Sequence, residues 1–369
     1  MPDRPLILFA GGGTGGHVFP AVAVAEQLAD GSRADVMMLC TERDIDSRIL
    51  MAAEIEFATQ SVRPFPRQPW HWPAFYRAWR RSYRQAAETI RRRQPAVVVG
   101  TGGYASGPAI RAAYNRHVHT ALLNPDLLPG RANRFCGRYA DAVFVQWPAT
   151  AKFFHHVSLV KATGCPIRRA FARADRGVAL RAHGLSADRR TLLVTGASQG
   201  ANTINRAVVE LADLIAGMTD WQVLHLAGAA DAGWVRDRWA ARCDRAVVID
   251  FTHDIADAFA AADLVISRAG ANTLAELTAL GRPSILLPYP YGDRHQRHNA
   301  EVLGEAGAAI VLGDRIDPLA NAEQLAPLLR ELAGYPERLT RMAVAARRLG
   351  RPAAARDVAD ALLELAGVN

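Results

Sequence analysis

The stretch Leu6-Ile-Leu-Phe-Ala-Gly11-Gly-Gly-Thr-Gly-Gly-His17 begins with a short apolar strand that runs into a glycine-rich turn. The stretch Leu192-Leu-Val-Thr-Gly196-Ala-Ser-Gln-Gly-Ala201 repeats this design about half a chain later. Helix-like sequence follows each turn, over residues 21–28 and 203–215. A strand, glycine turn and helix in this order direct free backbone N–H groups and a positive helix end to one point, which suits a phosphate. The repeated design predicts two Rossmann-like halves that face one another.

Apolar runs of strand length alternate with helical sequence along the chain, which is typical of parallel sheets covered by helices on both faces. The chain has 369 residues, half of them apolar, enough to bury the cores of two domains. The expected strands are residues 36–40, 96–100, 120–123 and 142–145 in the first domain, and 191–195, 222–227, 246–249, 264–267, 284–288 and 309–312 in the second. Glycine and proline interrupt the pattern near residues 160–166, so we expect the linker there.

Composition argues against several classes of protein. No apolar run reaches the ~18 residues of a membrane span, and residues 6–10 are too short for the core of a signal peptide. The four cysteines are scattered without CxxC spacing. This pattern argues against a zinc site or a disulfide framework and fits a reducing cytoplasm.

The first glycine turn permits two interpretations. Gly11-x-Gly13-x-x-Gly16 matches the dinucleotide fingerprint and would predict an NAD(P)-dependent oxidoreductase, but Glu42 lies somewhat beyond the position expected for the acid that holds the ribose. His17 lies where the turn becomes a helix, and an imidazole titrates near neutral pH and can act there as a general base. A histidine that only caps or packs at the turn has the same sequence.

A third strand, glycine turn and helix occupy Ser267-Arg-Ala-Gly270-Ala-Asn-Thr273-Leu-Ala-Glu276-Leu. Glu276 can accept two hydrogen bonds from the vicinal hydroxyls of a ribose. Thr273-Leu-Ala-Glu276 is also a capping box, in which Glu276 satisfies only its own helix start, and spacing alone leaves both interpretations open. Residues 264–299 contain no acidic pair of the DxD type that could hold a metal ion on a diphosphate. Arg168 and helix N-termini are therefore expected to neutralise a diphosphate in place of a metal ion.

Residues 63–93 are basic and aromatic in a chain of net charge +8, with nine arginines, seven aromatic residues and one acid, Glu88. Phe75, Trp79, Tyr83, Ala86 and Ile90 fall on one helical stripe. A basic amphipathic helix with tryptophans suits the headgroup layer of an anionic membrane. The alternatives are a core-packing helix with a solvated arginine face, and nucleic-acid binding. We favour the membrane because four of the aromatic residues lie outside the stripe.

Taken together, these motifs resemble the MurG family of bacterial cell-wall glycosyltransferases over nearly the whole chain. The matching stretches are Gly11–Pro20, Gly102–Pro108, Gly164–Arg168, Gly196–Ala201 and Arg268–Glu276. The resemblance implies a metal-independent, inverting transfer of N-acetylglucosamine from UDP-N-acetylglucosamine to the muramyl sugar of a polyprenyl-diphosphate-linked peptidoglycan precursor. It implies no cofactor and no nucleic-acid partner.

The resemblance also implies an α/β protein of the GT-B fold, with two Rossmann-like domains whose parallel sheets face a central cleft. Residues 1–162, joined by a C-terminal helix over 352–369, would form the acceptor and membrane-facing domain. Residues 163–351 would bind the UDP-sugar. The implied location is peripheral, on the cytoplasmic face of the inner (plasma) membrane, with residues 63–93 on the anionic lipid surface.

Roles for individual residues follow from the same resemblance. His17 is implied as the catalytic base, Glu276 as the ribose ligand, and Phe251 and Thr252 as the uracil site. Arg168, Ser198 and the helix start at 271–275 would hold the diphosphate, while Gln296 and the 14–16 turn would meet the transferred sugar. The full set of implied substrate-binding residues is Thr14, Gly15, Gly16, Tyr104, Arg168, Ser198, Gln199, Thr252, Ala271, Asn272, Thr273, Leu274, Ala275, Glu276 and Gln296.

Three positions depart from the family pattern. Leu123-Asn-Pro-Asp126 stands where the family has His-Glu-Gln-Asn, His295-Gln296 where it tends to have Gln-Gln, and Cys165 where it has Asn. The first departure touches the region where acceptor and donor sugar would meet. A related enzyme that glycosylates another lipid, such as a diacylglycerol, is therefore an alternative. A UDP-sugar epimerase or a non-catalytic sugar-nucleotide binder is another, although neither needs the basic aromatic surface.

Overall fold

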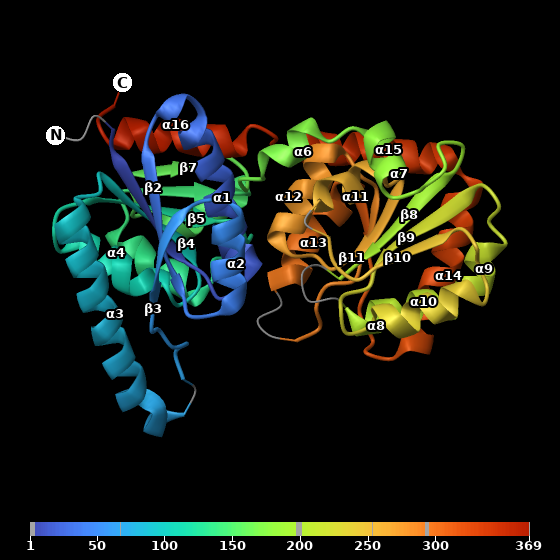
Figure 1. The fold of residues 1–369 in the computed structure, drawn as a ribbon, viewed down its shortest axis with the longest axis horizontal. Helices are drawn as coiled ribbons and strands as arrows, with labels where there is room; N and C mark the ends of the chain where they lie inside the picture. Colours follow the sequence, from blue (N-terminus) through green and yellow to red (C-terminus); the bar gives the residue numbers. More distant parts are fainter. Residues whose placement is uncertain (1–3, 67, 197–200, 253, 292–294, 369) are drawn as a thin grey trace. The chain divides into compact units, whose positions relative to one another are not determined.

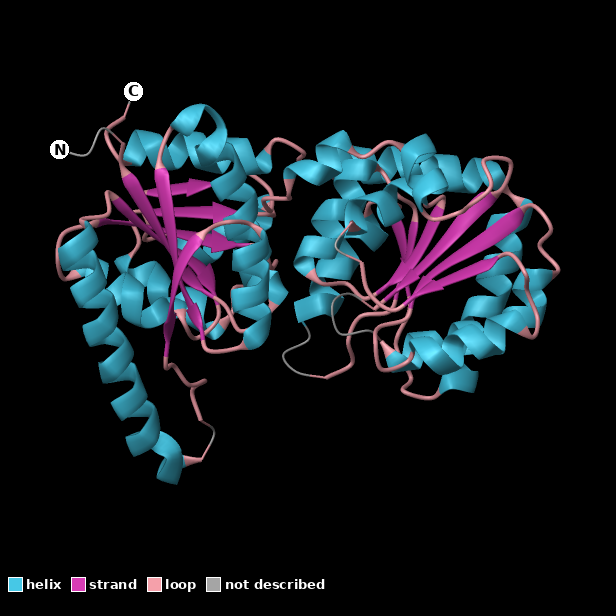
Figure 2. Ribbon diagram, viewed as in Figure 1, coloured by secondary structure: helices cyan, strands magenta, loops and turns pink. Residues whose placement is uncertain are grey.

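The computed structural model describes residues 4–66, 68–196, 201–252, 254–291 and 295–368. The chain forms two compact units, one of Met1–Arg169 with Arg351–Asn369 and the other of Ala170–Gly350. Each unit is a parallel sheet with helices on both faces (Figure 1 and Figure 2). The first unit runs past residue 162, where the linker sequence placed the boundary, as far as Arg169.

The sheet of the first unit has seven parallel strands in the order β3-β2-β1-β4-β5-β6-β7. Its strands are β1 Leu6–Gly11, β2 Asp35–Thr41, β3 Glu56–Gln60, β4 Val97–Gly102, β5 His119–Asn124, β6 Ala142–Val145 and β7 Leu159–Lys161. Its helices are α1 Gly15–Ala29, α2 Asp44–Ala52, α3 Trp72–Arg93, α4 Ser106–Tyr114, α5 Arg131–Cys136 and the C-terminal α16 Ala354–Leu365.

Alternating side chains of these strands build two separate cores, as the two-residue period of a strand requires. Ile7 and Phe9 of β1 belong to one cluster, which also contains buried residues of α1 and α16. Leu6 and Leu8 belong to the other, with buried residues of α3 and α4. The C-terminal helix α16 is thus part of the core of the N-terminal unit.

The second unit has six parallel strands in the order β10-β9-β8-β11-β12-β13. They are β8 Arg190–Thr195, β9 Trp221–Leu226, β10 Ala246–Ile249, β11 Leu264–Ser267, β12 Ser284–Leu286 and β13 Ala309–Val311. The helices after the unit boundary are α7 Arg176–Ala182, α8 Asn202–Glu210, α9 Ala212–Ala216, α10 Ala232–Ala240, α11 Ile255–Ala261, α12 Ala271–Leu280, α13 His295–Glu305, α14 Pro318–Gly334 and α15 Pro336–Leu349. The short helix α6, Arg169–Arg173, spans the boundary between the units.

Both sheets therefore confirm the predicted α/β class and its strand positions, with β6, β10 and β11 ending at the expected residues. The helix expected over 203–215 is wrong in one respect, because Leu211 separates α8 from α9. The first helix starts at Gly15, inside the glycine-rich stretch, and not near Ala21. Thr14 is its N-cap residue, with extended backbone angles.

Candidate active site

Each sheet has one place where the strand order reverses, between β1 and β4 in the first unit and between β8 and β11 in the second. Ligands of open parallel sheets bind beyond the carboxyl ends of the strands at such a place. His17 lies in the first turn of α1, which follows β1, Tyr104 lies in the turn after β4, and α12 follows β11. The structure thus places most of the predicted site residues at the two positions where topology favours a ligand.

His17 packs on a second glycine turn at the end of β4. A Cβ built on Gly102 would lie 2.7 Å from Nδ1 of His17, and one built on Gly103 would lie 3.1 Å from Cδ2. Gly102 and Gly103 have φ angles of +104° and +74°, which side-chain-bearing residues rarely adopt. The glycines of this turn therefore make room for the imidazole.

The surroundings of His17 keep the ring neutral. Burial lowers the pKa of His17, and the carboxylates of Asp126 and Asp46 oppose that shift only in part. Nδ1 is buried, and the backbone of Thr101 is a further group that raises the pKa of His17. A neutral imidazole near neutral pH is the protonation state that a general base needs.

The first glycine turn already holds an anionic group of the protein. The backbone N–H of Gly13 donates to Oδ2 of the buried Asp46 at 2.7 Å. A dinucleotide would need this N–H for its own diphosphate and would meet a carboxylate there. The oxidoreductase interpretation of this turn therefore fails on charge.

Helix α12 begins at Ala271, with Gly270 as its N-cap residue, and no side chain caps it. Thr273 therefore lies inside the first turn, and Glu276 lies in the second turn. The capping-box interpretation of these two residues is wrong, because it requires Thr273 to be the N-cap residue. The first turn of α12 contains no acidic residue, so its N-terminal N–H groups face no competing carboxylate from that turn.

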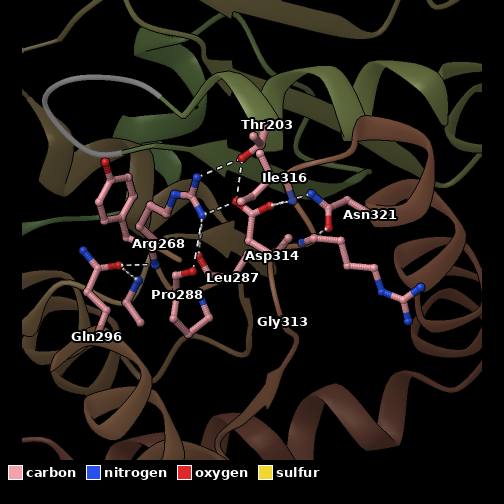
Figure 3. Close-up of polar contacts among 12 residues, drawn as sticks. Thr203, Arg268, Leu287, Pro288, Gln296, Gly313, Asp314, Ile316 and Asn321 are labelled. Atoms are coloured by element: carbon pink, nitrogen blue, oxygen red, sulfur yellow. Dashed lines mark hydrogen bonds and ion pairs between the residues drawn. The ribbon is translucent and has the colours of Figure 1, made fainter. Parts of the chain in front are cut away.

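Gln296, in α13, joins two strand ends through one atom. Its Oε1 accepts hydrogen bonds from the backbone N–H of Ala269 at 3.2 Å and of Tyr289 at 2.9 Å (Figure 3). Ala269 follows β11, and Tyr289 follows β12. With Oε1 used in this way, Gln296 has its amide N–H₂ group left as the part suited to a sugar hydroxyl.

Arg268 is a central residue of this region that the sequence reasoning missed. It is 9% exposed, and its guanidinium donates to the carbonyl of Leu287 at 3.0 Å, Oδ2 of Asp314 at 2.7 Å and Oγ1 of Thr203 at 2.9 Å (Figure 3). Asn321 and the backbone N–H of Ile316 both donate to Oδ1 of Asp314 at 2.8 Å.

These bonds tie the ends of β11, β12 and β13 to the first turn of α8. Hydrogen bonds also hold the pKa of Asp314 below its ordinary value, in opposition to burial. An arginine that directly follows an apolar strand was the signal available in the sequence.

The remaining predicted residues of the donor set lie in different places. Phe251 and Thr252 follow β10; the ring of Phe251 is exposed, and Oγ1 of Thr252 accepts from the N–H of Asp254 at 3.0 Å. Ser198 and Gln199 lie outside the described residues. Arg168 belongs to the first unit, where its guanidinium lies over the ring of Phe19 at 4.5 Å.

The segment 123–126, where the chain departs from the family pattern, is held by amide side chains. Nδ2 of Asn133 donates to the Leu123 carbonyl at 3.1 Å and to Oδ1 of Asn124 at 2.9 Å. Nδ2 of Asn124 in turn donates to the Asp126 carbonyl at 2.7 Å. Asn124 is buried, and both ends of its amide are engaged. Asp126 is the ionisable side chain of this segment.

Helix α3 has one end packed in the core and exposed aromatic residues near its other end. Its last turns are core: Ala86 and Ile90 are buried, with Tyr83 packed against them. Trp79 also packs inward, since a Cβ on Gly107 would lie 2.7 Å from its ring. The aromatic residues near its start are exposed, namely Phe65, Trp70, Trp72 and Tyr76. The first turns of α3 extend beyond the sheet of their unit (Figure 1).

Among the described residues, no helix is long and apolar enough to cross a membrane. In the same part of the chain, no three side chains of His, Cys, Asp or Glu gather into a group that could hold a metal ion.

Comparison with known proteins identifies the family. Residues 7–145 match the glycosyltransferase family 28 N-terminal domain, and residues 191–360 match the family 28 C-terminal domain. A protein of Desulforamulus reducens is 35% identical over 95% of this chain and 96% of its own, and one of Thermodesulfovibrio yellowstonii is 34% identical over 97% and 98%. Both are named UDP-N-acetylglucosamine–N-acetylmuramyl-(pentapeptide) pyrophosphoryl-undecaprenol N-acetylglucosamine transferase. The chain belongs to the MurG family.

Solved structures agree with that assignment and confirm the predicted GT-B fold. The crystal structure of Acinetobacter baumannii MurG superposes with a TM-score of 0.73 at 25% identity, covering 98% of this chain and all of that one. A UDP-N-acetylglucosamine 2-epimerase superposes with a TM-score of 0.72, but at 17% identity it shares the fold alone. Among the alternatives weighed from the sequence, these comparisons favour the MurG family.

Proposed function

We propose that this chain transfers N-acetylglucosamine from UDP-N-acetylglucosamine to the muramyl sugar of a polyprenyl-diphosphate-linked peptidoglycan precursor. Membership in the MurG family over nearly the whole chain supports this activity. The single observation that carries the donor half is the start of α12, where N–H groups open onto a turn without an acidic side chain. A helix N-terminus of this kind attracts a diphosphate.

The donor is held by the second unit and by Arg168. The N-terminus of α12, residues 271–275, and Arg168 neutralise the diphosphate together with Ser198, while Glu276 accepts hydrogen bonds from the ribose hydroxyls. Phe251 and Thr252 line the uracil. Gln296 and Gln199 meet the donor, Gln296 through its amide N–H₂ group. Backbone dipoles and a guanidinium thus stabilise the leaving UDP without a metal ion.

The acceptor half lies in the first unit. His17 takes the proton from the acceptor hydroxyl as that oxygen attacks the anomeric carbon; the bond to UDP breaks in the same displacement, which inverts the configuration. Thr14, Gly15, Gly16 and Tyr104 surround His17 and form the acceptor and sugar side of the site. Holding two reactants in line converts a bimolecular reaction into an effectively unimolecular step.

The protein acts peripherally on the cytoplasmic face of the inner membrane. The exposed aromatic residues Phe65, Trp70, Trp72 and Tyr76 lie among the arginines of residues 63–93. Tryptophan and arginine together suit the headgroup layer of anionic lipids. The partner of this basic surface is thus a membrane and not a nucleic acid.

The test is transfer of labelled N-acetylglucosamine from UDP to a panel of acceptors. Label is expected on the lipid-linked muramyl acceptor and not on diacylglycerol, and chelator should leave the rate unchanged. Label on diacylglycerol alone would overturn the acceptor assignment. Glu276→Ala provides the donor arm: UDP affinity should fall while the melting temperature holds, because Glu276 does not cap α12. A fall in melting temperature with unchanged UDP affinity would remove Glu276 from the site.

A further inference from the structure

Asp46 lies in the first turn of α2, but its carboxylate contacts groups outside that helix. The residue is fully buried, and its Oδ2 accepts three hydrogen bonds. The donors are the backbone N–H of Gly13 at 2.7 Å, the backbone N–H of Thr41 at 3.1 Å and Oγ1 of Thr41 at 2.6 Å. A buried carboxylate is costly unless it is hydrogen-bonded, so three donors on one oxygen form a specific anchor.

Arg43 holds the same residue, Gly13, through the next peptide group. Its Nη1 donates to the carbonyl of Gly13 at 2.8 Å. Gly12 and Gly13 have φ angles of +129° and +90°, and a Cβ on Gly12 would lie 2.3 Å from Oδ2 of Asp46. The turn can therefore approach the carboxylate only because Gly12 has no side chain.

We propose that Asp46 is a positioning residue: it fixes the turn at Gly13 and so places His17 for its role as the general base. This inference rests on the proposed function of His17. Thr14 follows Gly13 directly and is the N-cap residue of α1, and the N–H of His17 donates to the carbonyl of Thr14 at 3.1 Å. A displacement of Gly13 is thus transmitted to His17 through one short, hydrogen-bonded turn.

The negative charge of Asp46 also affects the pKa of His17. Burial lowers the pKa of His17, while Asp126 after β5 and Asp46 on α2 raise it. The backbone of Thr101, after Gly100 in β4, raises it as well. Arg43, bonded to Gly13, and the hydroxyl of Tyr104, 3.4 Å from the position of a Cβ on Gly13, also lie near the turn. Loss of the Asp46 charge should therefore lower the pKa of His17 further.

Two substitutions of Asp46 separate its role as a hydrogen-bond acceptor from the effect of its charge. Asp46→Asn keeps an oxygen for the three donors, but it removes the charge and puts an amide N–H₂ where the buried Oδ1 has no partner among the described residues. Asp46→Leu removes the acceptor. The matched control is Asp44→Asn, which removes an acid from the same turn of α2 at an exposed position.

The measurements are NMR titration of the His17 imidazole, hydrogen exchange at the Gly13 amide, and kcat with donor KM. In Asp46→Asn, we expect His17 to titrate at lower pH and kcat to fall about tenfold. In Asp46→Leu, we expect rapid exchange at Gly13 and a fall in kcat of about 100-fold, the size of effect that a 1 Å misplacement produces. UDP affinity should stay at the wild-type value in both, and Asp44→Asn should match the wild type throughout.

Wild-type titration of His17 and wild-type kcat in Asp46→Asn would overturn the inference. A lower melting temperature with unchanged kcat per folded molecule would do the same, because it would make Asp46 merely structural. Failure of the proposed function is distinguishable: His17→Ala would then retain full activity, while the titration of His17 and the exchange at Gly13 would still report on the anchor. If Asp46→Leu does not fold, Asp46→Asn alone decides the matter.

Discussion

The turn after β1 and the start of α12 share the order strand, glycine turn and helix, yet their electrostatics are opposite. In the first, the N–H of Gly13 is taken by the buried carboxylate of Asp46. In the second, α12 has no acid in its first turn, and the buried Arg268 directly follows the preceding strand. We propose that the same backbone design serves proton chemistry at one site and anion binding at the other.

This difference explains why the fingerprint Gly11-x-Gly13-x-x-Gly16 is a poor guide to phosphate binding. Glycines allow the backbone to turn sharply and to approach a partner closely, but they do not say which partner. At Gly12 and Gly13 the partner is a side chain of the protein itself. The charge beside a glycine turn decides whether it can take a phosphate.

The largest effect is expected from removing the imidazole of His17. His17→Ala should lower kcat by about 10²–10⁴-fold, the usual cost of removing a general base, with little change in UDP affinity. In the wild type, kcat/KM should rise with pH through the lowered pKa of His17 and then level off, because the base must be unprotonated. Turnover near the wild-type value in His17→Ala would make this histidine a packing residue. Steady-state kinetics across a pH series, with UDP titrated separately, provide the measurement.

The next prediction gives the start of α12 a carboxylate, as the turn after β1 already has. Gly270→Asp places a carboxylate at the N-cap of α12, where aspartate is a favourable cap. Gly270 has φ −64° and ψ 142°, and a Cβ there meets only Oγ1 of Thr273 at 3.8 Å, so the substitution is free of strain. We expect the fold to be as stable as the wild type and UDP affinity to fall about tenfold to 100-fold, since like charges repel and the N–H groups are occupied.

Gly270→Ala is the matched control, because it adds the same Cβ without the charge. A tenfold rise in Kd removes about 1.4 kcal/mol of the stabilisation that excess UDP confers, which a thermal-shift series can resolve. Equal UDP binding by the Asp and Ala variants would show that α12 does not hold the diphosphate. NAD should shift the melting temperature of none of these proteins.

Much of this architecture was predictable from the sequence, because the central strands carry long apolar runs. The strands that were missed, β3 and β7, are the two edges of the first sheet. β3 has one buried residue in five, and β7 has only three residues, so neither produces a buried apolar run. Hydrophobic pattern reports burial, and edge strands are the least buried part of a sheet.

The site was predictable in outline only. His17, Glu276 and the 271–275 helix start are marked by local motifs, whereas the partners of Asp46 and Arg268 are distant in sequence. Gly13 and Asp46 are 33 residues apart, and Arg268 and Asp314 are 46 apart. Such contacts depend on which strands are neighbours, and a single sequence does not state that order. The capping-box prediction failed for a related reason, since glycine caps a helix without leaving a side-chain signal.

A smaller effect is expected from changing Asp126, which influences the pKa of His17. Asp126→Asn removes the carboxylate that contributes most to raising the pKa of His17. The acid limb of kcat/KM should therefore move to lower pH, and further than in Asp46→Asn. The change also restores the amide that the family has at this position, so the preference for UDP-N-acetylglucosamine over UDP-glucose is measured on the same acceptor. If the acid limb, the donor preference and the acceptor KM all stay unchanged, Asp126 has no role at this site.

The smallest effect concerns the proposed binding of the first unit to an anionic membrane surface. Trp79 packs against the ring of Phe135, at 5.7 Å between centroids, so its replacement would disturb the fold. Trp70 and Trp72 are 71% and 52% exposed, and they are the tryptophans suited to a test.

The triple substitution Trp70→Ser, Trp72→Ser and Arg80→Gln should weaken sedimentation with anionic vesicles several-fold, because each basic residue near the surface contributes about 1 kcal/mol. Binding should fall as salt rises, since the contact is partly Coulombic. UDP affinity and transfer to a soluble acceptor analogue should stay at wild-type values, because Trp70, Trp72 and Arg80 are exposed and are not among the proposed binding residues. Equal binding to neutral and anionic vesicles would contradict the basic-surface proposal, and loss of UDP binding in this variant would mean that the substitutions damage more than the membrane surface.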